Sequence, residues 1–408
     1  MKDVIQINQK QSWLTTPITG QQLYIGSLLV YLTVAFLQNT TFSSFIGSRP
    51  YNLTTYIIFV ILVFKIFFYD HYQFSTNMII GACLLVAVIV WWRTKSNLIL
   101  AMTVLILGMK GVDFDRVVRL SLQLNFWLLV AVIACAATGI ISNLAFAAAE
   151  RGTRYALGVI YPTDFAARVL YILLADAYLN YQSLTWRRYA MYAAIAVTIK
   201  QVTDARLNFA CMLLLIPVLA LAKHAETKRS QNQQSSIAKL VSLYWVATPV
   251  LAATALFGTI LYDPANHLET QIDHLLSGRL TFGQMAIEKY PLKLFGQPVV
   301  EHGYGNNMSL FRNGSVHYMF IDSSFVRLFA VYGMITAVII IGVMMYISIK
   351  QTHAGHYALP AILLIVTLSA VVEQHLLEPT YNLWLLALIP SVNNSRLKSE
   401  ACNSARQK

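Results

Sequence analysis

Long apolar runs recur along almost the whole chain, and short polar segments separate them. Each run approaches the roughly 20 residues that a helix needs to cross about 30 Å of hydrocarbon. A β-barrel would instead show short segments in which apolar and polar residues alternate. The pattern predicts an all-α, polytopic membrane protein with about twelve transmembrane helices in a single domain, residues 1–408. The predicted spans are 22–38, 53–69, 77–92, 97–111, 121–142, 163–181, 188–203, 207–222, 239–262, 324–349, 357–374 and 380–392.

One polar interval is longer than the others and lies before the tenth span. It extends from His274 to Gly333, and most of it belongs to a predicted loop over residues 263–323. The residues after Arg279 have the apolar spacing of a short amphipathic helix lying along a membrane surface. We therefore expect the loop to carry short helices and the chemistry of the protein, while the spans hold it at the membrane.

Composition agrees with a membrane class. The chain of 408 residues is 57% hydrophobic and 12% charged, whereas soluble proteins carry about 25% charged residues. The four cysteines, Cys83, Cys135, Cys211 and Cys402, are scattered and indicate neither a disulfide framework nor a metal site. The first 20 residues lack the apolar core of a signal peptide, so we expect the first span to insert without cleavage. No nucleotide-binding or metalloprotease motif occurs, and we expect no cofactor and no metal.

The formal net charge of +12 is explained by membrane topology rather than by nucleic acid, for which no binding pattern appears. If the N-terminus is inside, the inner segments carry more Lys and Arg than the short outer loops. This bias places both termini in the cytoplasm and loops 143–162 and 263–323 outside the plasma membrane. The inner basic residues are Lys2, Lys10, Lys110, Arg116, Arg119, Arg187, Arg188, Lys223, Lys228, Arg229, Lys239, Lys350, Arg396, Lys398, Arg406 and Lys408.

Several outer basic residues oppose this bias and are candidate functional residues. Arg151 and Arg154 lie in the first outer loop, and Lys200 and Arg206 flank a very short turn. Ionisable groups near the hydrocarbon are costly and usually functional. Arg206 is either an interfacial arginine paired with Asp204 or an anion site, because a guanidinium binds phosphate with two parallel hydrogen bonds.

Arg279 and Asp322 are the candidates in the long loop. Arg279 alone could contact lipid headgroups, but with the other outer arginines it predicts a shared basic cavity. Asp322 precedes the tenth span and either caps that helix or acts as a general base. His302 and His317 are polar loop residues, with proton transfer as a second possibility.

The other ionisable residues of note have structural explanations. Glu373, His375 and Glu378 lie at the outer end of the eleventh span, where we expect them to be counter-ions of the basic cluster. Asp176 lies inside the sixth span and is expected to pair with another helix. Asp113-Phe114-Asp115 has the form of a metal-nucleotide motif, but its short inner loop leaves no room for a nucleotide-binding sheet.

Several short motifs occur together in the chain. They are Arg154-Tyr155-Ala156-Leu157-Gly158 through Tyr161-Pro162, Asp204-Ala205-Arg206, Ser277-Gly278-Arg279, Leu294-Phe295-Gly296, Ile321-Asp322-Ser323-Ser324-Phe325 before Tyr332-Gly333, and Glu373-Gln374-His375. With these motifs the chain resembles the Wzy-type polysaccharide polymerases, in the superfamily that includes the O-antigen ligases. It is most similar to the capsular or exopolysaccharide repeat-unit polymerases of Gram-positive bacteria, and the resemblance covers nearly the whole chain in topology.

The resemblance implies a metal-independent glycosyltransferase. The donor would be a growing glycan on undecaprenyl pyrophosphate, and the acceptor a single repeat unit on a second such lipid. Asp322, Arg279 and Arg206 would be catalytic. Arg151, Arg154, Lys200, Arg327 and His317 would bind substrate. Membrane lipids, a flippase and a chain-length regulator of the same pathway would be its partners.

Three alternatives remain open at this point. The ligase branch has a histidine where this chain has Asp322, which favours a polymerase over a ligase-like glycan transferase. A lipid-linked oligosaccharide flippase also fits many spans and intramembrane charges, although we find no pair of related halves. A non-catalytic scaffold of a polysaccharide assembly complex is the third alternative.

Overall fold

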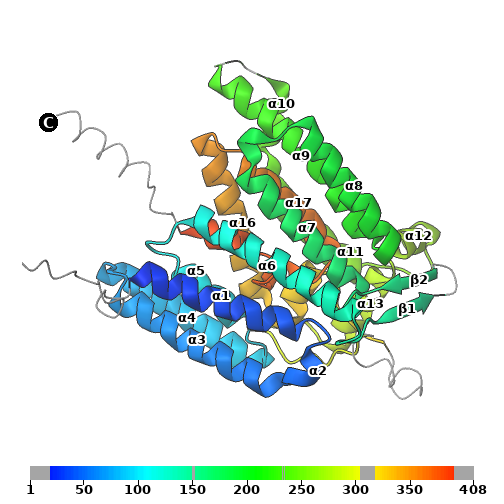
Figure 1. Ribbon diagram of the computed structural model, residues 1–408, viewed down its shortest axis with the longest axis horizontal. Coiled ribbons are helices and arrows are strands. Elements are labelled where there is room, and N and C mark those ends of the chain that lie inside the picture. The colour runs from blue at the N-terminus through cyan, green and yellow to red at the C-terminus, as the bar shows by residue number, and fades with distance from the viewer. Residues whose placement is uncertain (1–18, 149–151, 232, 234, 304–317, 390–408) are drawn as a thin grey trace, which may run out of the picture.

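The computed structural model describes residues 19–148, 152–231, 233, 235–303 and 318–389. It is a helical bundle with one two-stranded sheet (Figure 1). The first elements are α1 (Gly20–Gln38), α2 (Ser43–Ile46), α3 (Ser48–Phe68), α4 (Phe74–Thr94), α5 (Leu98–Leu107), α6 (Phe114–Ala137), β1 (Ala145–Ala148), β2 (Gly152–Tyr155), α7 (Pro162–Leu179) and η1 (Tyr181–Ser183). The remaining elements are α8 (Trp186–Thr203), α9 (Arg206–Ser230), α10 (Ser236–Ser242), η2 (Tyr244–Val246), α11 (Ala247–Ile260), α12 (His267–Leu275), α13 (Arg279–Lys289), α15 (Ser324–Arg327), η3 (Leu328–Tyr332), α16 (Met334–Ala354), α17 (Ala358–Val372), η4 (His375–Leu377) and η5 (Trp384–Leu388).

Seven helical segments in the described part of the chain are long and apolar enough to cross a membrane. Two shorter helices, α5 and α17, are also apolar. These helices fit a membrane protein, as the apolar runs predict. The seven segments are Gly20–Gln38, Ser48–Phe68, Phe74–Thr94, Phe114–Ala137, Arg206–Ser230, Ser236–Ile260 and Met334–Ala354.

The sixth and seventh predicted spans form α7 and α8, and each of these 18-residue helices carries three charged residues. The charge inside α7 is paired with α8, as predicted for Asp176. The hydroxyl of Tyr192 donates to the Asp176 carboxylate at 2.6 Å, and Arg188 lies 3.6 Å from it. Asp176 is half-buried, and partners lower the cost of removing part of its charge from water.

The described chain is mostly helical, as predicted, and it also contains one small sheet that the sequence did not predict. The loop over residues 143–162 forms an antiparallel hairpin, in which β1 pairs with β2 and Phe146 faces Arg154. The hairpin packs beside the start of α7, where Pro162 occupies the first helical turn. Proline favours that position because its fixed φ suits a helix and its missing N–H is not needed there.

The twelfth predicted span, 380–392, is wrong as a membrane helix. After α17 the chain returns through the bundle as a buried segment, residues 373–389, with only the short 3₁₀ turns η4 and η5. The ring of Trp384 meets Phe114 at the start of α6 and Tyr178 near the end of α7. Irregular backbone is tolerated at such depth only where protein covers it.

Side chains help to satisfy the backbone of this return segment. Asn382 donates to the carbonyl of Leu376 at 2.6 Å and accepts the N–H of Trp384 at 3.1 Å. Asn382 is fully buried, so each of these hydrogen bonds replaces one that water would otherwise make.

The tenth predicted span is interrupted near its start. It begins as α15, widens into the π-helix η3 and breaks at Gly333 before α16. Gly333 has φ +92°, and a Cβ there would come within 2.5 Å of the carbonyl oxygen of Leu294. Gly296, with φ +77°, makes the same close approach to the carbonyl of Val331. Only glycine permits this contact, which fastens the long loop to the segment that follows Asp322.

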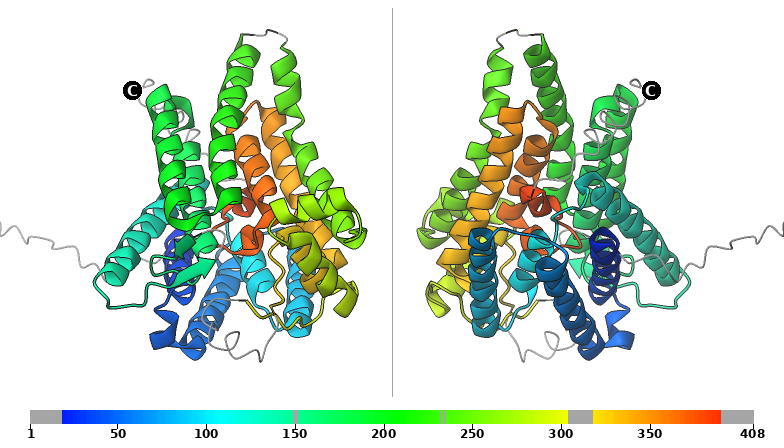
Figure 2. Two further views of the ribbon diagram at one scale, coloured as in Figure 1. Left: turned by 90° about the vertical axis from the view of Figure 1, so that its right-hand side faces the viewer. Right: turned by 90° about the vertical axis from the view of Figure 1, so that its left-hand side faces the viewer.

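The two ends of the bundle differ. Figure 1 shows the start of α1 at one end and α12, α13 and the hairpin at the other. Residues 373–389 return towards the end at which α1 begins. Figure 2 shows α12 and α13 at the margin of the bundle, across the ends of the longer helices. The long loop therefore gathers at one end, where the cavity described next lies.

Candidate functional site

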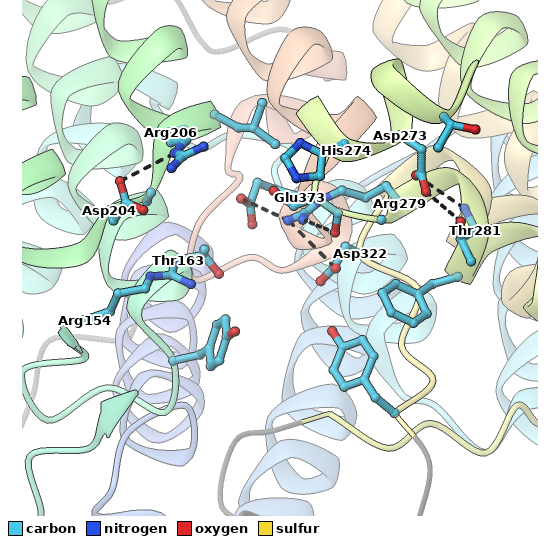
Figure 3. Close-up of a pocket in the computed structure, with 18 of the residues that line it drawn as sticks. Arg154, Thr163, Asp204, Arg206, Asp273, His274, Arg279, Thr281, Asp322 and Glu373 are labelled. Carbon is cyan, nitrogen blue, oxygen red and sulfur yellow. Dashed lines mark hydrogen bonds and ion pairs between the residues drawn. The ribbon is translucent and has the colours of Figure 1, made fainter. Parts of the chain in front are cut away.

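A cavity of about 580 Å³ opens at the end of the bundle that carries α12, α13 and the hairpin. Its walls come from α7, α9, α12, α13, the segment 318–322 and the residue after α17. Figure 3 shows Arg154 and Arg206 on one side and Arg279 reaching in from the other. The structure thus brings together four of the predicted site residues, Arg154, Arg206, Arg279 and Asp322.

Arg206 is the first residue of α9. The turn before it is tight, since Asp204 ends α8 in the left-handed conformation with φ 44° and ψ 36°. The Arg206 Nε atom lies 3.6 Å from the Asp204 carboxylate. The side chain of Arg206 is 55% exposed, so this pair contributes little stability and leaves the guanidinium available to a ligand.

Arg279 is the first residue of α13. Ser277 and Gly278 both have positive φ and turn the chain sharply from α12 into α13. Asp273 then caps the new helix, because its carboxylate accepts the N–H of Leu280 at 2.7 Å and the hydroxyl of Thr281 at 2.6 Å. Arg279 is thereby directed towards the end of α17, where its Nε donates to the carbonyl of Val372 at 3.0 Å.

The two arginines occupy an unfavourable place for a cation. The first turn of a helix carries unpaired N–H groups and the positive end of the helix dipole. A positive side chain there destabilises the helix, so helix stability does not explain Arg206 or Arg279. The Asp273 carboxylate already caps the start of α13. The guanidiniums of Arg206 and Arg279, together with the start of α9, are therefore what this cavity offers to an anion.

Asp322 does not cap the helix that follows it. The cap is Ser323, whose side chain accepts the N–H of Val326, so the capping hypothesis for Asp322 is wrong. The Asp322 carboxylate lies 3.8 Å from Nη2 of Arg279 and faces the cavity. Burial raises the pKa of this carboxyl above its usual value, although Arg279 and Arg327 oppose the shift. A raised pKa makes the carboxylate a stronger base than an exposed aspartate.

Glu373 shares Arg279 with Asp322. Its Oε1 lies 4.0 Å from the same Nη2 atom and accepts a hydrogen bond of 3.1 Å from Asn208 on α9. The residue follows the last residue of α17, and its carbonyl accepts the N–H of Ser324 at 3.1 Å. Burial raises the pKa of the Glu373 carboxyl to about 7, although Arg279 opposes the shift. Glu373 therefore joins three elements at the cavity.

Arg154 lines the cavity from the hairpin and is 9% exposed. Its Nε donates to the carbonyl of Thr203 at 2.7 Å, and its guanidinium lies 5.7 Å from the centre of the Tyr161 ring. These contacts fix the side chain and satisfy one of its five N–H groups. Within the described part of the chain, its other N–H groups are available to a ligand.

Two other predicted substrate-binding residues do not line the cavity. Lys200 lies over the ring of Phe209, 4.9 Å from its centre. Arg327 makes a bidentate pair with Glu301, at 2.8 and 2.9 Å, and its Nε donates to the carbonyl of Ile321 at 3.1 Å. Arg327 thus holds the residue next to Asp322 in place. Arg151, His317 and the tail with Cys402 lie outside the described residues.

The predicted counter-ions divide into two groups. Glu373 lies beside the basic residue Arg279, as predicted. His375 and Glu378 instead form a separate group with Asp164, in which the His375 ring lies 3.1 Å from Glu378 and 3.4 Å from Asp164. The same ring stacks on Tyr381 at 3.9 Å, which fixes the start of the return segment.

Sequence reasoning missed Asp273 and Asn208. Asp273 is 6% exposed and holds α13, but its role depends on the turn at Ser277 and Gly278, which becomes visible only in three dimensions. Asn208 lies two residues after Arg206, and no sequence pattern marks it. Among the described residues, no group of three His, Cys, Asp or Glu side chains is arranged to hold a metal ion.

Asp113 is also explained. It caps α6 by accepting the N–H of Asp115 at 3.2 Å, so the Asp-Phe-Asp segment is a helix start.

Comparison of the chain with protein-family models, curated proteins and solved structures finds no match. The functional argument therefore rests on the site itself.

Proposed function

We propose that the cavity binds the diphosphate of a lipid-linked glycan and transfers the glycan to a second lipid-linked sugar, as a polysaccharide repeat-unit polymerase does. The observation that carries the proposal is the convergence of Arg206 and Arg279, each at a helix start, beside the carboxyl of Asp322. The sequence resemblance supplies the substrate class, undecaprenyl-pyrophosphate-linked oligosaccharides.

The arginines stabilise the leaving group. When the bond between the anomeric carbon and the diphosphate oxygen breaks, the electron pair stays on that oxygen. Arg206 and Arg279 face this developing charge from opposite sides of the cavity, and Arg154 adds a third cation. Preorganised donors of this kind supply a large share of catalysis, because they need no reorganisation as charge develops.

Asp322 is the base. An acceptor sugar hydroxyl attacks the anomeric carbon, a new C–O bond forms, and the hydroxyl proton passes to the Asp322 carboxylate. A carboxylate whose pKa is raised by burial accepts a proton more readily at neutral pH. Arg279, 3.8 Å away, orients the carboxylate and links the base to the leaving-group site.

Glu373 orients Arg279 without neutralising it. With a pKa of about 7, Glu373 holds a proton for much of the time near neutral pH. A neutral carboxyl still accepts the hydrogen bond from Asn208 and lies 4.0 Å from Nη2 of Arg279, but it leaves the charge of Arg279 to the diphosphate. Deprotonation of Glu373 would make it a competitor for Arg279.

The membrane surrounds the bundle, and both lipid carriers lie beside its helices. The proposed orientation has the cavity on the outer face of the plasma membrane and both termini in the cytoplasm, as the distribution of Lys and Arg predicts. Single cysteines placed near Arg154 and in residues 263–303 should react with an impermeant reagent on intact cells. Labelling of Cys402 under those conditions would reverse the orientation and contradict the proposed reaction.

Reconstitution tests the reaction directly. Purified protein in vesicles should convert a lipid-linked repeat unit into a ladder of polymers, without added nucleotide and in excess EDTA. A ladder that disappears with EDTA and returns with Mg²⁺ or Mn²⁺ would contradict the metal-independent mechanism. Single repeats that remain unjoined under all conditions would contradict a polymerase.

A flippase is the second candidate, because another cavity of about 600 Å³ lies at the opposite end of the bundle. The start of α7 lines the first cavity and its end lines the second. A flippase would move the lipid-linked glycan between leaflets without joining repeats. Movement of a fluorescent lipid-linked glycan between vesicle leaflets, without polymer formation, would favour this function.

A further inference from the structure

Helix α12 has an apolar stripe that no part of the described chain covers. Leu268, Ile272 and Leu275 are 68%, 50% and 72% exposed. At 3.6 residues per turn these three positions fall on one side of the helix, within about 60°. Asp273 and Thr270 fall on the other side, where they face the cavity. The helix therefore has a cavity face and an uncovered apolar face.

A helix of nine residues is too short to be stable through its backbone alone. In folded proteins such helices are stabilised mainly by packing of their apolar side. Here only Asp273 is buried, and the other residues of α12 are exposed or half-buried. The apolar stripe thus needs a partner, and large exposed apolar surfaces mark interaction sites.

The position of α12 identifies that partner as the lipid bilayer. The N–H of Asp263 donates to Glu269 at 2.7 Å, and the hydroxyl of Thr270 donates to the carbonyl of Pro264 at 3.2 Å. These bonds hold α12 next to the end of α11, the last part of a segment long and apolar enough to span a membrane. Phe257 and Leu261, at that end, are 57% and 72% exposed. Five residues separate Leu261 from the start of α12, so the stripe follows this exposed apolar surface directly along the chain.

We propose that α12 lies in the membrane interface, with Leu268, Ile272 and Leu275 inserted among the acyl chains. Amphipathic helices with this pattern bind in the plane of the interface and bury their apolar side a few ångströms into the lipid. The sequence assigned the surface helix to the residues after Arg279, but α13 buries Gly283 and Ala286 against its neighbours, and the exposed stripe belongs to α12.

The contact also has a consequence for the cavity. Asp273 joins α12 to the start of α13, and α13 begins with Arg279. Because His274 and Thr270 line the cavity, a helix fixed by lipid forms one of its walls. Anchoring α12 in the bilayer therefore positions Arg279. The lipid contact itself does not depend on the reaction that the cavity performs.

Site-directed spin labelling tests the contact. Cys83, Cys135, Cys211 and Cys402 are first replaced by serine, and a nitroxide is attached at Leu268→Cys, Ile272→Cys or Leu275→Cys. His267→Cys is the matched control, because it lies on α12 about 100° away from the stripe. The proteins are placed in vesicles of phosphatidylethanolamine and phosphatidylglycerol, and collision rates with oxygen and with a water-soluble nickel complex are measured.

Oxygen concentrates in the acyl chains and the nickel complex stays in water. We expect a higher oxygen-to-nickel collision ratio at the three stripe positions than at position 267. Equal or lower ratios at the stripe would overturn the proposal. Strong dipolar broadening between labels would also overturn it, because the stripe would then meet a second copy of the chain. Unchanged melting of each labelled protein excludes unfolding, and none of these readouts requires polymer formation.

Discussion

Two cavities of similar volume lie at opposite ends of the bundle, but they differ in how far their charged side chains are exposed. In the cavity beside α13, the side chains of Arg279, Asp322 and Glu373 are only 13%, 23% and 5% exposed. In the opposite cavity, Arg119 and Lys350 are exposed to solvent. Exposed charges cost little and contribute little, whereas buried charges are costly and occur mainly where function requires them. The comparison therefore favours the first cavity as the site of chemistry.

Removal of the proposed base, Asp322, should have the largest effect. We expect Asp322→Asn to lower the rate of polymer formation by about 10²–10⁴, the range for loss of a general base. The melting temperature should change little, because Ser323 caps α15. Asp263→Asn, in an exposed part of the same loop, is the matched control. An Asp322→Asn protein with the wild-type rate would remove Asp322 from the mechanism.

Replacement of the arginines should have the next largest effect. Lysine keeps the charge but cannot make the two parallel hydrogen bonds of a guanidinium. We expect Arg279→Lys to lose about 10²–10³ in rate, or roughly 2.7–4 kcal/mol of transition-state stabilisation. Arg206→Lys should lose less, because Arg206 is 55% exposed and more flexible.

Arg119→Lys at the opposite cavity is the control for both arginines. The rate is measured with purified protein and a lipid-linked repeat. If Arg119→Lys reduced the rate as much as Arg279→Lys, the difference between the two cavities would disappear. Normal polymerisation by both Arg206→Lys and Arg279→Lys would exclude the proposed binding of the diphosphate.

Glu373→Gln should have a smaller effect that depends on pH. Because the pKa of Glu373 is about 7, the wild-type carboxyl loses its proton as pH rises through that value and then competes for Arg279. Glutamine stays neutral, so the ratio of wild-type to variant rate should fall as pH rises from about 6 to 8. A ratio that does not change with pH would remove Glu373 from the control of Arg279.

The same shift predicts the direction of a stability change. A carboxyl whose pKa is raised on folding binds its proton more tightly in the folded state. Its contribution is present below the ordinary value of 4.5 and is lost as pH rises through about 7. Wild type should therefore lose melting temperature relative to Glu373→Gln over this interval. The opposite trend would show that the folded protein favours the ionised carboxylate.

The long helices could be predicted because the length and composition of an apolar run are local properties. The return segment could not. An apolar run such as 380–392 has the same composition whether it forms a lipid-facing helix or an irregular segment covered by protein. What decides is the surrounding bundle, which covers Trp384 with Phe114 and Tyr178. The helix break at Gly333 could not be predicted either, because it depends on contact with Gly296, which is distant in the sequence.

Part of the candidate site could be predicted from the sequence. The topology rule singled out Arg206, and a family resemblance supported Arg279 and Asp322. The roles of neighbouring residues were harder to predict. Asp322 and Ser323 are both good helix caps, and the sequence does not show which side chain accepts the hydrogen bond from the helix N–H. Asp273 and Asn208 act through contacts across the fold, so no spacing in the sequence reveals them.

The smallest effect is expected at the opposite cavity. We expect the double variant Arg119→Gln and Lys350→Gln to change the rate of polymer formation by less than about fivefold, because an exposed charge contributes about 1 kcal/mol at most.

The same protein should be assayed for movement of a fluorescent lipid-linked glycan between leaflets. A polymerase uses only the cavity beside α13, whereas a flippase must accept its lipid at both ends. If the double variant stopped movement between leaflets in a protein that forms no polymer, the two cavities would be the two ends of a transport route. If polymer formation continued in the double variant and stopped in Asp322→Asn, the chemistry would belong to the cavity with the buried charges.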